Sequence, residues 1–198
     1  MSQAGTISLE QSDGTPIALP TLWRNGPVLL FFMRQLGCGL CRQQLLRLRD
    51  QQARFGEAGC TIGVIVMGDG KMAHGLHELY NLPFPVYADP FMLAYEAFDI
   101  GETSLWNVAG PQIIVRQIGT ALQGLKPSWG TGSIKQLGGL VIVDQAGTVL
   151  YRHVASPIYR YPPWDEVLAA LPSEQEMGNS SYDINLSSVA ASGRQNFQ

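Results

Sequence analysis

The stretch GPVLLFFMRQLGCGLCRQQLLRLRDQQAR, residues 26–54, decides the fold of this chain. It opens with a run of six apolar residues, Val28–Met33, directly after a turn signal. Such a run is typical of a strand that is buried on both faces, as in a parallel sheet. After Cys38 and Cys41 the apolar positions recur every three or four residues, which is the spacing of one helix face. The two cysteines therefore lie where a buried strand passes into an amphipathic helix, and we expect that helix to end near residues 56–59.

This junction is suited to thiol chemistry. The free N–H groups and the partial positive charge of a helix N-terminus stabilise a thiolate. Arg34 and Arg42 flank the cysteines and add positive charge. We therefore expect the pKa of Cys38 to lie below the ordinary value of about 8.5. Cys41, three residues further on and on the same face, is placed to attack an oxidised Cys38.

Two other interpretations of the cysteine pair stay open. The pair can be half of a zinc site, since His74 and His77 are spaced to share a helix face and a Cys2His2 set is conceivable. It can also be an inert structural pair. A CxxC motif at a strand-to-helix junction, in a chain that alternates strands and helices, favours a thioredoxin-like redox motif.

The composition limits the classes of function. The chain has 198 residues, 45% of them hydrophobic and 15% charged, which is enough for one domain with a real core. A net charge of −3 gives no nucleic-acid footprint. No apolar run approaches the ~20 residues of a membrane span, and no secretory signal is visible. Three cysteines make no disulfide framework, so we expect a reducing, cytoplasmic setting and no cofactor.

The rest of the chain predicts an α/β fold, a central mixed sheet flanked by helices. Apolar runs at 60–67 and 86–88 predict further buried strands, and a hairpin is expected near the C-terminus. The hairpin strands are predicted at residues 138–143 and 148–154. Helices are predicted at residues 71–80, 92–98 and 163–171. We expect a single domain over residues 1–172 and a polar, disordered tail over 173–198.

Residues 101–132 are predicted to form a helical insertion before the hairpin. A lid over the reactive edge, a dimer contact and simple covering of the core are all open for it. Cys60 begins a strand, so in a parallel sheet it lies at the edge opposite the CxxC motif and outside the site. Lys71 and His74 follow the C-terminal end of that strand; they either approach the cysteines or are ordinary exposed residues.

Three segments carry a resemblance to a known family: FFMRQLGCGLCR (31–42), LPFPVYADP (82–90) and QLGGLVIVD (136–144). Over residues 5–172 the chain resembles the peroxiredoxin-like proteins of the alkyl hydroperoxide reductase and thiol-specific antioxidant (AhpC/TSA) group, in the thioredoxin-like superfamily. The resemblance implies a thioredoxin-like fold and a thiol oxidoreductase. It implies small-molecule peroxides or related substrates and a thioredoxin-type or glutathione reductant. An oligomer is possible.

The resemblance also implies roles for individual residues. Cys38 is expected to attack the peroxide and Cys41 to resolve the product. Arg34 and Arg42 are expected to favour the thiolate, and Gln35 to hydrogen-bond substrate.

The chain departs from the peroxiredoxin pattern at three positions. Phe31 and Gln35 stand where peroxiredoxins carry proline and threonine ahead of the peroxidatic cysteine. Gly138 stands nearest to the position of their arginine. These differences favour an alternative function, a redox-sensing or partner-binding module with little turnover.

Overall fold

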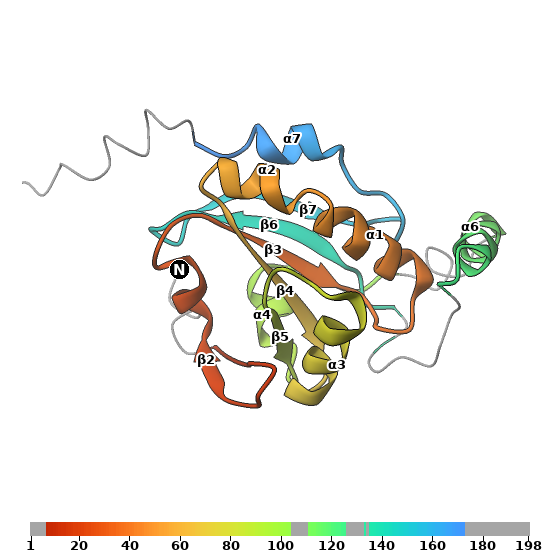
Figure 1. The fold of residues 1–198 in the computed structure, drawn as a ribbon, viewed down its shortest axis with the longest axis horizontal. Coiled ribbons are helices and arrows are strands. Elements are labelled where there is room, and N and C mark those ends of the chain that lie inside the picture. Colours follow the sequence, from red (N-terminus) through yellow and green to blue (C-terminus); the bar gives the residue numbers. More distant parts are fainter. Residues whose placement is uncertain (1–6, 104–110, 126–132, 134, 173–198) are drawn as a thin grey trace, which may run out of the picture.

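A computed structural model describes residues 7–103, 111–125, 133 and 135–172. These residues build one seven-stranded mixed sheet in the order β2-β1-β5-β4-β3-β6-β7 (Figure 1). Strands β3, β4 and β5 pair in parallel, whereas β6 pairs antiparallel with β3 and β7, and β1 pairs antiparallel with β5 and β2. The bounds are β1 Ser8–Glu10, β2 Pro16–Ala18, β3 Val28–Met33, β4 Thr61–Met67, β5 Val86–Asp89, β6 Gly139–Val143 and β7 Val149–Val154. The predicted mixed sheet and its C-terminal hairpin are confirmed.

The central strand β3 is buried along its whole length. It pairs with β4 from Val28↔Thr61 onward and with β6 from Val28↔Val143 back to Phe32↔Gly139. A strand with a neighbour on each side and helices over both faces must be apolar throughout, which explains the unbroken run. Cys38 and Cys41 follow the C-terminal end of β3, whereas Cys60 precedes the N-terminal end of β4. Because β3 and β4 are parallel, the CxxC pair and Cys60 lie at opposite ends of these strands, as predicted.

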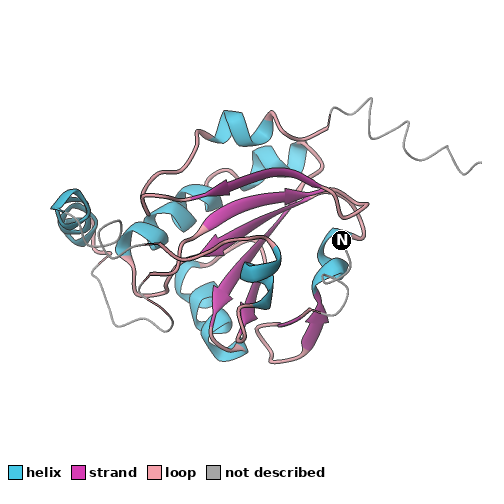
Figure 2. Cartoon of the chain, turned by 180° about the vertical axis from the view of Figure 1, so that it is seen from behind, coloured by secondary structure: helices cyan, strands magenta, loops and turns pink. Residues whose placement is uncertain are grey.

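Helices cover both faces of the sheet (Figures 1 and 2). Helices α1, α2, α3 and α7 cover one face, and their buried side chains share a core with Phe31 and Leu140. The 3-10 helix η2 and helix α4 cover the other face around Phe32 and Val141. The bounds are η2 Leu19–Trp23, α1 Gly39–Arg49, α2 Gln52–Glu57, α3 Gly70–Tyr80, α4 Leu93–Ala97 and α7 Trp164–Leu168.

The helix predicted to run from the cysteines to residues 56–59 is broken, which corrects that prediction. α1 ends at Arg49, a turn follows at Asp50, and α2 starts at Gln52. The N–H of Gln51 bonds to the carbonyl of Leu48, three residues back, which tightens the last turn. Aspartate is a poor helix former and is unfavourable at the negative end of a helix, so the break falls at a weak position.

The predicted helical insertion exists as α6, Pro111–Leu122, which lies apart from the sheet near the start of α1 (Figures 1 and 2). Its apolar stripe is largely exposed: only Ile113 is buried, while four other apolar side chains face solvent, Ile114, Val115, Ile118 and Leu122. Residues 126–132 and the predicted tail 173–198 lie outside the described residues. None of the described helices is long and apolar enough to cross a membrane.

Candidate active site

The structure places the two cysteines together at the start of α1, directly after β3. Cys38 is the N-cap residue of α1, with an extended backbone, and Cys41 lies in the first turn. The carbonyl of Cys38 accepts the first helical hydrogen bond, from the N–H of Arg42 at 3.1 Å. Both side chains are buried, at 3% and 1% exposed, and both are free thiols.

The two thiols have opposite pKa shifts. Burial by itself raises the pKa of Cys38. The hydrogen bond that the Cys41 thiol donates to the Cys38 sulfur, the charge of Arg34 and the backbone N–H of Cys41 all lower this pKa, and together they outweigh burial. The pKa of Cys38 is thereby lowered to about 5. The same hydrogen bond, together with burial and the negative charge of Cys38, raises the pKa of Cys41 well above its ordinary value. At neutral pH the pair is therefore one thiolate and one thiol, which is the state that a nucleophile with a nearby resolving group needs.

Arg34 is the buried positive charge of this site. Its side chain is only 6% exposed, although arginine is almost never fully buried unless it is paired. Burial by itself lowers the pKa of Arg34. The negative charges of Cys41 and Cys38, and the hydrogen bonds that Arg34 makes with them, outweigh burial and raise this pKa. The guanidinium thus stays charged beside the sulfurs.

The two other predicted polar residues lie at the same edge. A terminal nitrogen of Arg42 lies 3.5 Å from the carbonyl oxygen of Gly37, and the carboxamide of Gln35 donates to the carbonyl of Ser133 at 3.4 Å. Arg42 thus contacts the backbone directly before Cys38, and Gln35 links the loop before Cys38 to Ser133. The roles predicted for them toward thiolate and substrate stay predictions.

Sequence reasoning missed a contact from the insertion. The Nε2 of Gln117, on α6, donates a hydrogen bond to the Cys38 sulfur at 3.7 Å. The first helical residue, Gly39, makes room for α6. A Cβ there would lie 2.5 Å from Thr120 Oγ1 and 2.7 Å from the Leu125 carbonyl oxygen. The helical spacing predicted α6 itself, but nothing local to residue 117 signals a contact 79 residues away.

Tyr161 was also missed. Its ring packs against Phe31 at 6.0 Å between centroids. Burial and the charges of both cysteines raise its pKa well above the ordinary value. A Cβ at Gly138 would meet the Tyr161 hydroxyl at 3.0 Å and the Phe32 carbonyl oxygen at 2.7 Å. A side chain at position 138 would therefore collide with this wall of the site, whereas peroxiredoxins carry an arginine near that position.

The remaining candidates lie outside the site. Cys60 directly precedes β4 at the far edge, where burial raises its pKa to about 12. Lys71 and His74 are exposed on α3, which supports their interpretation as ordinary surface residues. Among the described residues, no group of three or more His, Cys, Asp or Glu side chains is arranged to hold a metal ion. The geometry thus gives the zinc interpretation no support.

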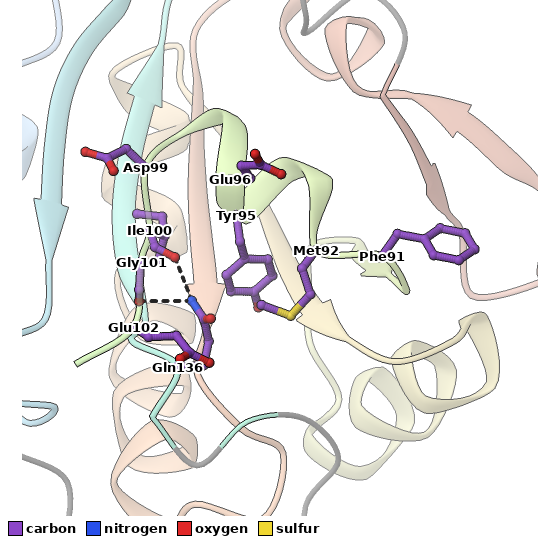
Figure 3. Close-up of a pocket in the computed structure, with 9 residues that line it drawn as sticks. All are labelled: Phe91, Met92, Tyr95, Glu96, Asp99, Ile100, Gly101, Glu102 and Gln136. Atoms are coloured by element: carbon purple, nitrogen blue, oxygen red, sulfur yellow. Dashed lines mark hydrogen bonds between the residues drawn. The ribbon is translucent and has the colours of Figure 1, made fainter. Parts of the chain in front are cut away.

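A surface pocket of about 290 Å³ lies on the other face of the sheet (Figure 3). Gln136 closes one side and donates to the carbonyls of Ile100 and Gly101. Glu96 and Glu102 line it together with Asp99, whose carboxylate pairs with Arg152 at 2.6 Å. It is lined by Phe91, Met92, Tyr95, Glu96, Asp99, Ile100, Gly101, Glu102 and Gln136. The cysteines belong to the core of the opposite face and are not among the residues that line this pocket.

Comparison with known proteins gives one matching family model and several relatives of similar length. The family model described as AhpC/TSA antioxidant enzyme matches residues 47–156, a range that begins after both cysteines. Prostamide/prostaglandin F synthase of Salmo salar is 27% identical over 179 residues, covering 86% of this chain and 87% of that protein. The Danio rerio protein of the same name is 26% identical over 170 residues, covering 80% of each chain.

Solved structures share the fold. Peroxiredoxin Q of Xanthomonas campestris superposes with a TM-score of 0.59 at 18% identity, covering 86% of this chain and 92% of that one. Peroxidoxin BcpB of Mycobacterium tuberculosis gives a TM-score of 0.55 at 19% identity, covering 83% and 90%. The fold is therefore that of the thioredoxin-like peroxiredoxins.

Proposed function

Because the chain belongs to the family of AhpC/TSA antioxidant enzymes, we propose that it reduces peroxides with Cys38 as the nucleophile and Cys41 as the resolving thiol. The observation that carries this proposal is the paired state of the two sulfurs. The pKa of Cys38 is about 5 and that of Cys41 is raised, so a thiolate and a proton-bearing thiol lie in contact.

In the first step, the Cys38 thiolate attacks the terminal oxygen of a hydroperoxide. A sulfur–oxygen bond forms, the O–O bond breaks, and the leaving alkoxide takes a proton from water to become an alcohol. Cys38 is oxidised to a sulfenic acid. The charge of Arg34 keeps the nucleophile ionised before the attack.

In the second step, Cys41 attacks the sulfenic sulfur. Once Cys38 carries no negative charge, the charge that raised the pKa of Cys41 is gone, while Arg34 still lowers it. The Cys41 proton leaves with the hydroxyl as water, and an intramolecular disulfide forms. A thioredoxin-type dithiol, or two glutathione molecules, then supplies two electrons and restores both thiols. Such a cycle suits a reducing compartment such as the cytoplasm.

The test is peroxide consumption by the full chain, coupled to thioredoxin and its reductase or to glutathione. We expect turnover that Cys38→Ser abolishes and that Cys60→Ser, a variant of a buried thiol at the far edge, leaves unchanged. The substrates are hydrogen peroxide, an alkyl hydroperoxide and, given the names of the relatives, a prostaglandin substrate. Undiminished turnover by Cys38→Ser would refute the assignment.

A second candidate is a redox-sensing module of the same fold. It is favoured by the burial of Cys38, at 3% exposed, and by Phe31 and Gln35 at the peroxiredoxin signature positions. A sensor would form one disulfide per chain with excess peroxide and show no steady-state turnover with any of the reductants. Turnover over many cycles would exclude this candidate.

A further inference from the structure

One contact that the proposed cycle does not use joins α6 to the reactive sulfur. The carboxamide of Gln117 donates to Cys38 at 3.7 Å. A hydrogen bond to an ionised acceptor is roughly twice as strong as one between neutral groups, so this contact favours the thiolate over the thiol.

The neighbouring residue Thr120 orients the carboxamide. Its hydroxyl lies 2.9 Å from the backbone carbonyl oxygen of Gln117 and 3.4 Å from the side-chain oxygen. Thr120 is itself buried at 2% exposed. With the oxygen end of the carboxamide beside this hydroxyl, the nitrogen end faces the sulfur.

Helix α6 and the residues directly after it contact the start of α1 and the segment after the hairpin. The oxygen of Gln123 accepts a hydrogen bond from Gln43 on α1 at 2.8 Å. At the other end of the helix, Gln112 accepts one from Tyr159 at 2.9 Å, and the Arg116 guanidinium stacks 4.1 Å from the Tyr159 ring. Thr120 and the Leu125 carbonyl also lie against Gly39, the residue next to Cys38.

We propose that α6 is part of the thiol site: Gln117 stabilises the Cys38 thiolate, and the helix limits the size of the substrate that reaches the sulfur. This inference deepens the proposed function and rests on Cys38 as its nucleophile. Cys38 is only 3% exposed, and the contacts of Gln117 with its sulfur and of Thr120 with Gly39 place α6 beside it, which assigns the helix a covering role.

The test of Gln117 is the pH dependence of Cys38 alkylation by iodoacetamide in the reduced full chain, assigned by peptide mass. Gln117→Leu keeps the size of the side chain but removes the donor, so the acid dissociation constant of Cys38 should fall about three- to tenfold. Gln117→Glu places a carboxylate beside the thiolate and should lower it further. Gln123→Leu, which breaks the hydrogen bond between the residue directly after α6 and Gln43 without touching the sulfur, is the matched control and should leave the dissociation constant unchanged.

The covering role of α6 is tested by comparing the rates at which iodoacetamide and a bulky maleimide alkylate Cys38. Ile113→Ala removes a buried side chain that anchors α6 and should speed the bulky reagent several-fold more than the small one. Equal acceleration of both reagents would overturn the cover, and equal effects of Gln117→Leu and Gln123→Leu on the dissociation constant would overturn the role of Gln117. Neither measurement needs peroxide turnover, so failure of the proposed function is seen separately, in the coupled assay.

Discussion

The buried guanidinium of Arg34 donates a hydrogen bond to the sulfur of Cys38 and places a positive charge beside it. This relationship turns an apolar strand-to-helix junction into a site where a thiolate is stable. The burial of Cys38 alone would raise its pKa, and the sign is reversed by the Cys41 thiol, by Arg34 and by the backbone N–H of Cys41. The predictions below separate these contributions.

Arg34→Met should raise the pKa of Cys38 by about one to three pH units, because an adjacent opposite charge is removed. Thiolate absorbance measures this directly. Since the pKa of Cys60 is about 12 and that of Cys41 is raised, only Cys38 ionises below pH 8. Arg47→Met, an exposed arginine of α1, is the control and should leave the titration as in the wild type. An unchanged titration in Arg34→Met would show that the charge does not act on the thiol.

Two variants of Cys41 should differ in the pKa of Cys38. Serine can still donate a hydrogen bond to Cys38, so Cys41→Ser keeps most of the lowered pKa, whereas Cys41→Ala loses the donor and raises it. Mass spectrometry after one equivalent of peroxide should show Cys41→Ser with one added oxygen and the wild type with two hydrogens lost. A disulfide formed by Cys41→Ser through Cys60 would contradict the assignment of Cys41 as the resolving thiol.

Stability should depend on pH through Cys38. Its pKa is about 5 in the folded chain and about 8.5 when unfolded, so the thiolate stabilises the fold above pH 8.5 and this contribution is lost as pH falls through 5. One proton limits the slope to about 1.4 kcal/mol per pH unit. Urea unfolding under reducing conditions should therefore show the wild type gaining stability over Cys38→Ala between pH 5 and 8. A constant difference across this range would refute the shifted pKa.

Gly39→Ala should destabilise the fold by about 1–3 kcal/mol, because its Cβ would overlap Thr120 Oγ1 and the Leu125 carbonyl oxygen. The matched control is Gly75→Ala on α3, where a Cβ meets nothing within 4 Å. There the better helix propensity of alanine should raise stability by about 0.5–1 kcal/mol. Denaturant midpoints measure both. Stabilisation by both substitutions would show that α6 does not pack on Gly39.

The sequence by itself determined the frame of this protein. Six apolar residues in Val28–Met33 can be satisfied only between two neighbouring strands and two covering layers, and the change to helical spacing after Cys38 sets the strand-to-helix junction. From the parallel β3 and β4 it also follows that Cys60 lies at the far edge. These conclusions follow from the spacing of apolar residues along the chain and from the direction of neighbouring strands, both of which are local properties of the sequence.

Only the tertiary structure decided the surroundings of the sulfur. An arginine beside a CxxC motif is expected to be a flanking, exposed charge, whereas Arg34 is only 6% exposed in the packed chain. Gln117 reaches Cys38 across 79 residues, and Tyr161 comes from a segment after the hairpin that has no periodic pattern. The apolar stripe of α6 predicts that its apolar side chains face the core, but four of them are exposed, while Gln117 and Thr120 contact the residues of the site. Contacts between distant segments are fixed by the packing of the whole chain, so no local pattern records them.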